Sequence, residues 1–411
     1  MFHDVVGTSL LCTLRNVSYD GVTAVMVAIL LMTSGRSCLS ALQIEDFSGS
    51  SALQWPKKWT PENPPNVASL GGWSQGPDMC HAAEYLFNAS REDYDPTHAL
   101  LIIRRGQLVC ERYISSYYHS FHPFWTWSVA KSMVHLLIGI LVRQGRVDIH
   151  QPAAVYSSDL WPEPSDPRRN ITIDQLLRMR AGLSWTEGVD DAVMLFGPGR
   201  TDVGAYAASK SMAASPGAEW NYSTGATNIV TRVIRDVVGG PTALLEFLEE
   251  EVYSPLGMCC THLGFDGGGT FVGSSYLSSS VHDLAKIGLL YLRDGVWENR
   301  RVLPRGWMDH GRTASFVDDA IGMGYGAHWW LSPRHPGVFF ASGTGGQRLY
   351  LVPEDELIIV RMGSAAQRSY DQTADGSVHL GCGSRCEQPF WHSKFEPLVD
   401  ALVDNLRQLR V

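Results

Sequence analysis

Phe124-Trp125-Thr126-Trp127-Ser128-Val129-Ala130-Lys131 is the most informative stretch of the chain, because it ends in a Ser-x-x-Lys pattern. A long apolar segment with helical spacing, Met133 to Val142, follows it. Residues three apart on a helix share one face, so we expect a helix from Ser128 to Gln144 that places the Ser128 hydroxyl beside the Lys131 amine. A serine hydroxyl becomes a nucleophile when a neighbouring group takes its proton, and a partly desolvated lysine can do so.

The same pattern also fits a serine that caps a helix, followed by a solvated lysine one turn on. The chain contains six lysines, and Lys131 is the only one with a serine three residues before it. The apolar and aromatic flanks of the pattern argue against a capping turn at the surface.

Length and charge narrow the class of protein. The 411 residues allow two or three lobes, and the formal net charge is −9, from 33 Lys and Arg against 42 Asp and Glu. No basic run is present. The sequence therefore gives no electrostatic footprint for nucleic acid and indicates a globular protein of enzyme size.

The N-terminal residues 1–43 resemble a signal peptide or an anchor. Val22 to Met32 is almost wholly apolar and is followed by Arg36 and a cluster of small residues. This run is short for a transmembrane helix and suits the core of a signal peptide better. We expect an exported protein, secreted or periplasmic, with membrane anchoring as the alternative and a cytoplasmic location if the segment is not a signal.

Cleavage near Ala41 would leave six cysteines, an even number that permits disulfides in an exported protein. The loop from Cys382 to Cys386 is a candidate for one local bridge. A metal site at that pair is the alternative, but no nearby set of histidines and cysteines completes a four-ligand pattern. We expect no metal.

Secondary-structure patterns change along the chain from strands to helices and back. Residues 44–411 are expected to form one catalytic domain, with a mostly helical lobe over about 147–318. Two strands at the start and several at the end predict an antiparallel sheet built from both chain ends, in an α+β fold with flanking helices. The expected strands are Ala99 to Ile103, Leu108 to Tyr113 (after an Arg105-Gly106 turn), Ala327 to Leu331, Val338 to Ala341, Gln347 to Val352 and Glu356 to Met362; the expected helices, besides the first, are His81 to Asn88, Ile173 to Met179, Ala243 to Tyr253, Val281 to Leu292 and Phe395 to Leu409.

Several segments in order resemble the serine β-lactamase-like superfamily, which includes class C β-lactamases, D-alanyl-D-alanine peptidases, related esterases and 6-aminohexanoate-dimer hydrolases. The resemblance spans about Ala99 to Met362. Its segments are Ser128-Val129-Ala130-Lys131, Ile171 to Leu177 with Ala181-Gly182-Leu183, Trp220-Asn221-Tyr222-Ser223-Thr224, and Gly343-Thr344-Gly345-Gly346-Gln347.

The resemblance implies a role for each matched residue. Ser128 is the nucleophile that becomes acylated, Lys131 holds and shuttles its proton, and Tyr222 is the base or relay to the leaving group. The backbone N–H groups of Ser128 and Thr344 form the oxyanion hole, and Gly343 and Gly345 let substrate approach the strand. A buried aromatic at Tyr222 and a glycine-rich hairpin turn after Gly343 are the alternative readings.

Two positions depart from the superfamily pattern. The Tyr-x-Asn motif reads Tyr222-Ser223-Thr224, and Ala341-Ser342-Gly343 has no cation before its glycine. The missing cation argues against a dedicated β-lactamase or peptidoglycan peptidase. Arg348 is a candidate replacement charge, although strand alternation can turn it away from the cleft. Trp329, Trp330 and Tyr325 are expected to line or support the strand edge of the cleft, or to pack in the core.

We therefore expect a serine hydrolase that cleaves an ester or a small amide through an acyl-Ser128 intermediate, with no cofactor and a small-molecule substrate. The alternatives are a β-lactamase or D-alanyl-D-alanine carboxypeptidase, an acyltransferase with the same residues, and a non-catalytic penicillin-binding-like sensor.

Overall fold

The computed structural model describes residues 73–87, 97–320, 322–363, 369–372, 378–381 and 400–409. All of them belong to Asn66–Val411, the second of two units into which the chain divides. Residues 1–43 and the Cys382–Cys386 pair lie outside the described residues. Within the described ranges, no helix combines the length and apolar character needed to cross a bilayer.

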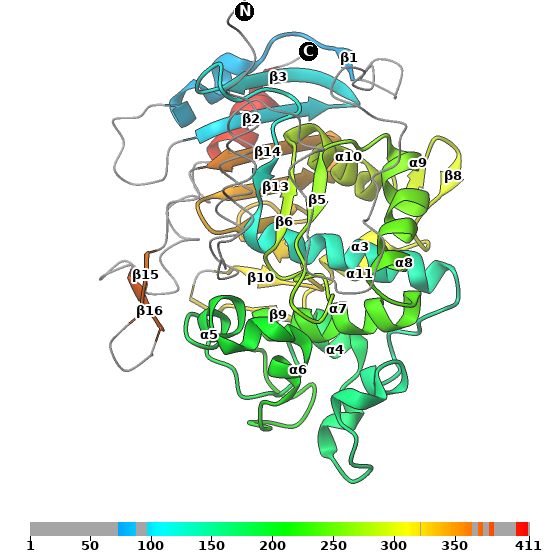
Figure 1. Cartoon of the computed structure of the whole chain (residues 1–411). Helices are drawn as coiled ribbons and strands as arrows, with labels where there is room; N and C mark the ends of the chain where they lie inside the picture. Colours follow the sequence, from blue (N-terminus) through cyan, green and yellow to red (C-terminus); the bar gives the residue numbers. More distant parts are fainter. Residues whose placement is uncertain are drawn as a thin grey trace, which may run out of the picture. The chain divides into compact units, whose positions relative to one another are not determined.

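A nine-stranded sheet forms the centre of this unit (Figure 1). Its strands follow the order β1-β3-β2-β14-β13-β12-β11-β10-β9. Their bounds are β1 Ser74–Gln75, β2 Thr97–Arg104, β3 Gln107–Tyr113, β9 Phe316–Val317, β10 Gly324–Tyr325, β11 Trp330–Leu331, β12 Phe339–Gly343, β13 Gln347–Val352 and β14 Leu357–Gly363.

The sheet joins the two ends of the chain, as the sequence predicts. Strand β14 pairs antiparallel with β2, so that Val360 lies opposite Leu101. Every pairing in the sheet is antiparallel except that of β1 with β3, which makes the sheet mixed at one edge. The predicted α+β class is confirmed.

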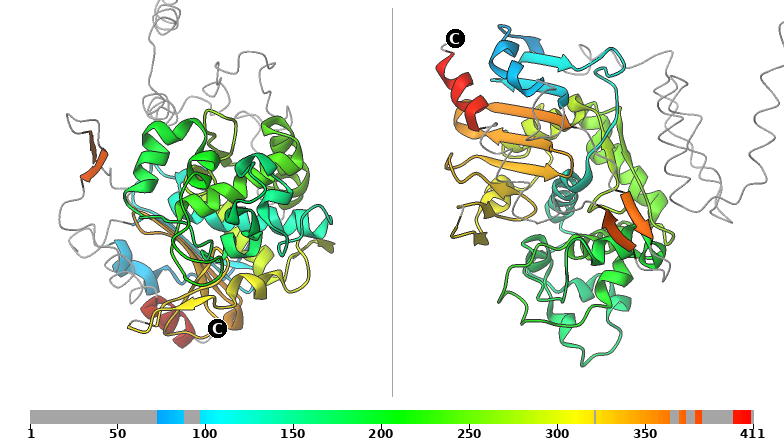
Figure 2. Two further views of the ribbon diagram at one scale, coloured as in Figure 1. Left: turned by 90° about the horizontal axis from the view of Figure 1, so that it is seen from below. Right: turned by 90° about the vertical axis from the view of Figure 1, so that its left-hand side faces the viewer.

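Both faces of the sheet are covered, which explains why its strands read as continuous apolar runs. Leu101 and Ile103 of β2 pack in the larger core with the helices, whereas Leu100 and Ile102 pack in a second core on the opposite face. Successive strand residues point to opposite faces, so each run supplies both cores. Figure 2 shows the C-terminal helix on one side of the sheet and α10 on the other.

The strand predictions hold with one exception. Arg105 and Gly106 both have positive φ, 51° and 73°, as a two-residue hairpin turn requires. The strand expected over Ala327 to Leu331 is wrong in its first part, because only Trp330–Leu331 is a strand. His328 adopts φ 57° and donates its N–H to Leu177 O, which breaks the extended run.

Helix α3 (Ala130–Arg143) crosses the larger core, and twelve of its fourteen residues are buried. The prediction for α10 is confirmed at both ends. Helix α4 begins at Ile173 as predicted and ends at Leu177, before the predicted Met179. The helix predicted from Ala243 to Tyr253 consists of α8, which begins at Pro241, and a π-helix that ends at Tyr253. Helix α7 is not predicted by the sequence patterns. The other α-helices are α4 Ile173–Leu177, α5 Asp190–Phe196, α6 Val203–Ala208, α7 Thr224–Val238, α8 Pro241–Leu248, α9 Ser254–Leu256, α10 Val281–Leu292 and α11 Trp307–Arg312.

The described residues also contain short helices and small sheets. The 3-10 helices are η2 Cys80–Phe87, η3 Trp127–Val129, η4 Ala153–Val155, η5 Ser158–Leu160, η6 Pro167–Asn170, η7 Pro198–Thr201 and η9 Pro353–Asp355, and η8 Glu249–Tyr253 is a π-helix. Small antiparallel sheets pair β4 Phe124–Trp125 and β5 Thr261–Leu263 with β6 Leu277–Ser279, β7 Val296–Trp297 with β8 Arg300–Arg301, and β15 Ser369–Gln372 with β16 Val378–Gly381.

The second core fixes two segments from opposite ends of the chain against the sheet. The helix expected near His81 is the 3-10 helix η2, and a disulfide joins its Cys80 to Cys110 of β3. Residues 400–408 are helical, as expected for that part of the predicted C-terminal helix, and Leu402 and Leu406 are buried in the same core.

Candidate functional site

Ser128 lies in the 3-10 turn η3, just before α3 begins. The residue before it, Trp127, adopts a φ of 50°, an uncommon value for a bulky side chain and typical of strained backbone at functional sites. Neither η3 nor α3 has a side chain that caps its first turn. The Ser128 hydroxyl instead accepts a hydrogen bond from Lys131 Nζ at 2.9 Å. The helix-capping interpretation of Ser128 is therefore wrong.

The Lys131 ammonium is enclosed by three acceptors. The side chain is 2% exposed, and besides Ser128 it donates to Thr224 Oγ1 at 3.2 Å and to Ser274 O at 3.1 Å. Burial lowers the pKa of Lys131 to about 8, and the carboxylates of Glu187 and Asp191 oppose that shift. A lysine with this pKa exists in both protonation states near neutral pH.

Tyr222 contacts the same pair of residues. Lys131 Nζ lies 5.0 Å from the centre of its ring. Burial and the charge of Glu187 raise the pKa of the Tyr222 hydroxyl, and the nearby Ser128 side chain lowers it in part. The structure thus brings together the three side chains that the sequence proposes for catalysis: Ser128, Lys131 and Tyr222.

The segment after Tyr222 begins helix α7. Ser223 is its N-cap, with Oγ accepting from Ala226 N at 2.9 Å. Thr224 in the first turn is buried, with its hydroxyl between Lys131 and Glu187. The hydroxyl that replaces the amide of the superfamily motif is therefore part of the lysine's surroundings.

Glu187 is a residue of the site that the sequence patterns missed. Its carboxylate accepts from Thr224 N at 2.9 Å and also from the Thr224 hydroxyl. Trp185 Nε1 donates to the same carboxylate at 2.6 Å. A carboxylate at the first turn of α7 is stabilised by the unsatisfied N–H groups there. Because Glu187 lies 37 residues before Thr224, no local spacing reveals it.

Gly343 passes closely behind the Ser128 turn at the end of β12. A Cβ at this position would lie 2.2 Å from Thr126 O and 3.3 Å from Ser128 N. Thr344, Gly345 and Gly346 form the turn to β13, with Gly345 at φ 76° and Gly346 at φ 74°. The hairpin turn expected after Gly343 is confirmed, and the structure adds a close approach of Gly343 to Ser128.

Arg361 lies under this turn and is 1% exposed. Its guanidinium donates from Nη1 to Gly345 O at 3.2 Å and to Gly346 O at 2.8 Å, and from Nε to Thr97 Oγ1 at 3.0 Å. A five-donor planar group can satisfy several such acceptors at fixed angles. Arg361 therefore holds the position of the turn.

Arg348 does not supply a charge to the site. It lies opposite Arg361 on the neighbouring strand and shares the strand face of Tyr350, which packs in the second core. Its Nη1 donates to Gly343 O at 3.1 Å and to Gln347 O at 3.0 Å. The alternation of side chains along β13 therefore turns Arg348 away from the cleft.

The three aromatic residues named from the sequence divide between site and core. Trp330 is half-buried and stacks on Tyr222 with 5.5 Å between ring centres. Tyr325 is buried and contacts the rings of both Tyr222 and Trp330. Trp329 is fully buried. Trp330 is thus the residue of the three that supports Tyr222 from a partly accessible position.

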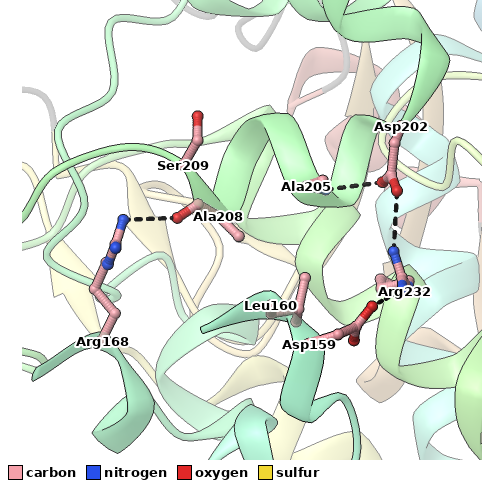
Figure 3. Close-up of a pocket in the computed structure, with 8 residues that line it drawn as sticks. All are labelled: Asp159, Leu160, Arg168, Asp202, Ala205, Ala208, Ser209 and Arg232. Atoms are coloured by element: carbon pink, nitrogen blue, oxygen red, sulfur yellow. Dashed lines mark hydrogen bonds and ion pairs between the residues drawn. The ribbon is translucent and has the colours of Figure 1, made fainter. Parts of the chain in front are cut away.

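A pocket of about 380 Å³ lies elsewhere, between α6, α7 and the η5–η6 region (Figure 3). Ser128, Lys131 and Tyr222 are not among its lining residues. Arg232 in its wall binds Asp202 at 3.0 Å and also Asp159. The wall of this pocket is thus formed in part by ion pairs, and the pocket is separate from the Ser128 site. Across the described residues, no group of three or more His, Cys, Asp or Glu side chains could hold a metal ion.

Comparisons with known proteins identify the family and the fold of the chain. Residues 89–381 match the family model described as Beta-lactamase. The 6-aminohexanoate-dimer hydrolase of Paenarthrobacter ureafaciens is 24% identical over 299 residues, which cover 65% of this chain and 72% of that protein.

Solved structures show the same fold. A Bacillus anthracis protein provisionally named as a 6-aminohexanoate-dimer hydrolase superposes with a TM-score of 0.63 at 23% identity, covering 78% of this chain and 82% of its own. A family VIII carboxylesterase superposes with a TM-score of 0.58 at 16% identity, over 81% of this chain and 99% of the carboxylesterase. A D-stereospecific amidohydrolase from Streptomyces sp. superposes with a TM-score of 0.53 at 20% identity, over 68% of this chain and 93% of the amidohydrolase.

Proposed function

The chain belongs to the beta-lactamase family, and on this premise we propose that it is a serine hydrolase that cleaves an ester or a small amide through an acyl-Ser128 intermediate. The observation that carries the proposal is the hydrogen bond from Lys131 Nζ to Ser128 Oγ at 2.9 Å, with the centre of the Tyr222 ring 5.0 Å from the same Nζ.

The contacts of Lys131 define how it would activate Ser128. A neutral amine has two N–H donors and one lone pair, and Ser274 O can only accept. When Lys131 is neutral, its donors serve Ser274 O and Thr224 Oγ1, and its lone pair faces Ser128. The serine proton then moves to Nζ as Oγ attacks the substrate carbonyl carbon.

Tyr222 would pass a proton to the leaving group. Its raised pKa keeps the phenol protonated at neutral pH, so it can donate as the C–O or C–N bond breaks and regain a proton from Lys131. Water then attacks the acyl-serine with the same groups acting in reverse, and the acid is released. An alcohol in place of water would give acyl transfer.

The negative charge that develops on the carbonyl oxygen needs donors already in place. We assign these to the backbone N–H groups of Ser128 and Thr344. Support comes from Gly343, whose missing side chain lets the strand end approach Ser128 N, and from Arg361, which holds the following turn.

Ester or small-amide substrates are favoured over β-lactams by the residues before Gly343. Ala341 and Ser342 provide no cation for a substrate carboxylate, and Arg348 lies on the other face of the sheet. The names of the similar proteins, a carboxylesterase, an amidohydrolase and a 6-aminohexanoate-dimer hydrolase, support the same choice.

A substrate panel tests the proposal against its alternatives. The panel contains a chromogenic short-chain ester, an anilide of a short acid and nitrocefin. We expect nitrocefin to be hydrolysed most slowly of the three. Mass spectrometry after acid quench should find an acyl group on Ser128. Nitrocefin as the fastest substrate would favour a β-lactamase, and absence of turnover and adduct with every substrate would favour a non-catalytic sensor.

We also propose that the protein is exported through the signal-like residues 1–43, with membrane anchoring as the alternative. The disulfide between Cys80 and Cys110 supports this, because such bonds persist in oxidising compartments. Fractionation of expressing cells, with the mature N-terminus read by mass spectrometry, tests it. Full-length protein in the cytoplasm would contradict export.

A further inference from the structure

Two adjacent cysteines, Cys259 and Cys260, lie just before strand β5. Neither forms a disulfide in the structure, and both side chains are half-buried. Their Sγ atoms are 3.0 Å apart. A disulfide bond is about 2.05 Å long, so closure would need the two sulfur atoms to move together by only about 1 Å.

The backbone around the pair is held by a buried carboxylate. Asp283 of α10 is 1% exposed, and its Oδ2 accepts from Cys259 N at 3.2 Å and from Cys260 N at 2.8 Å. Thr261 Oγ1 donates to the same oxygen at 3.0 Å. Lys286, one turn further along α10, donates to Gly257 O and lies 3.5 Å from Asp283 Oδ1.

This clamp matters for reactivity because it fixes the conformation of the two residues before any reaction. Groups held in place avoid much of the entropic cost of being brought together. The clamp acts on main-chain N–H groups and not on either sulfur atom.

We propose that Cys259 and Cys260 form a redox-active vicinal dithiol that closes to a disulfide in reaction with a low-molecular-weight disulfide. One cysteine thiolate attacks the small disulfide, forms a mixed disulfide and releases one small thiol. The second cysteine thiolate attacks the protein sulfur of that mixed disulfide and releases the second small thiol. The two cysteines lose two protons and two electrons, and the small disulfide is reduced to two thiols.

The closed pair is expected to reopen more readily than the other disulfide. Adjacent Cα atoms across a trans peptide are about 3.8 Å apart, below the usual Cα separation of disulfides, about 4.4–6.8 Å, and such deviation makes a bond more reducible. The peptide bond between the two residues is trans. Cys80 and Cys110, by contrast, have a Cα separation of 4.8 Å, within that range.

The sequence makes the pair easy to follow. No lysine or arginine occurs between Arg235 and Lys286, so trypsin releases one peptide, residues 236–286, in which Cys259 and Cys260 are the only cysteines. Its mass falls by two hydrogens when the bond closes.

In the experiment, the folded, full-length protein is treated with oxidised glutathione, and remaining thiols are trapped with an alkylating agent at low pH. After trypsin digestion, mass spectrometry measures the mass of the peptide 236–286. The wild type should lose both alkylation sites with no retained glutathione, whereas Cys259→Ser and Cys260→Ser should each stop at one glutathione adduct. Mild dithiothreitol should restore both sites while Cys80–Cys110 stays intact. Two alkylated cysteines after oxidation, a lasting adduct on the wild type, or reopening only after Cys80–Cys110 is reduced would overturn the proposal.

Discussion

Lys131 donates a hydrogen bond from Nζ to the Thr224 hydroxyl at 3.2 Å, which ties the lysine beside the nucleophile to the first turn of α7. The Thr224 hydroxyl in turn donates to the Glu187 carboxylate, whose charge raises the pKa that burial lowers. The protonation state of Lys131 therefore depends on a balance between burial and these carboxylates.

The first prediction concerns the pH dependence of hydrolysis. Lys131 must be neutral to take the proton of Ser128, and its pKa is about 8. Below that pH the amine is protonated and kcat/KM should fall about tenfold per pH unit, and above it the rate should level off. The measurement is kcat/KM for a chromogenic ester from pH 6 to 9.5, corrected with Ser128→Ala at each pH. A rate independent of pH through this range would contradict the assignment of Lys131 as the base.

Glu187→Gln should move that profile to lower pH. The carboxylate raises the pKa of Lys131, so its neutralisation leaves burial less opposed and the amine loses its proton earlier. We expect the ascending limb to shift down by on the order of one pH unit.

The matched control for this variant is Glu250→Gln, which removes an exposed carboxylate of the π-helical turn η8 and should leave the limb in place. A shift to higher pH in Glu187→Gln, or an equal shift in the control, would show that the Glu187 carboxylate does not raise the pKa of Lys131.

Gly343→Ala should impair turnover more than folding. The new methyl group would fall 2.2 Å from Thr126 O, so the end of β12 must move away from the Ser128 turn. A misplacement near 1 Å can cost about 100-fold in rate, and the strain should lower the free energy of unfolding by about 1–3 kcal/mol.

Gly268→Ala is the comparison for that variant, because its nearest atom to the added Cβ would be 3.4 Å away. Ester kinetics and urea unfolding of both variants measure the two effects separately. Wild-type kcat/KM in Gly343→Ala would show that the strand end is not part of the reaction site.

Arg361→Met should destabilise the protein. The side chain is almost fully buried, and its loss removes the hydrogen bonds to Thr97, Gly345 and Gly346 and leaves the two turn carbonyls without these donors. We expect the free energy of unfolding in urea to fall by about 2–5 kcal/mol. Exposed Arg305, changed to Met, serves as the control and should change it by about 0.5 kcal/mol or less. Equal stabilities of the two variants would mean that Arg361 does not hold the turn.

The sequence predicts the parts of the site that are encoded locally. Ser128 and Lys131 are three residues apart across the junction of η3 and α3, so their contact follows from local helical spacing. Strands β13 and β14 are apolar runs flanked by turn residues, which the sequence pattern also identifies.

The rest depends on tertiary contacts. Helix α7 is rich in Val, Ile and Thr, which lower helix propensity, and its burial against the core overrides that preference. Glu187 reaches the site only because a loop folds onto the start of α7, and the face of Arg348 is settled by the sheet register. Cys80 and Cys110 pair because η2 packs beside β3, which no cysteine count can specify.

The central claim is that Ser128 carries the acyl group, and rapid-quench mass spectrometry of the protein with a slow activated ester tests it most directly. The wild type should gain the mass of one acyl group, mapped to the peptide that contains Ser128, and lose it as acid appears. Ser128→Ala should show no adduct and a rate lower by about 10³-fold or more. Turnover by Ser128→Ala at the wild-type rate, or an acyl group mapped to another residue, would contradict the account.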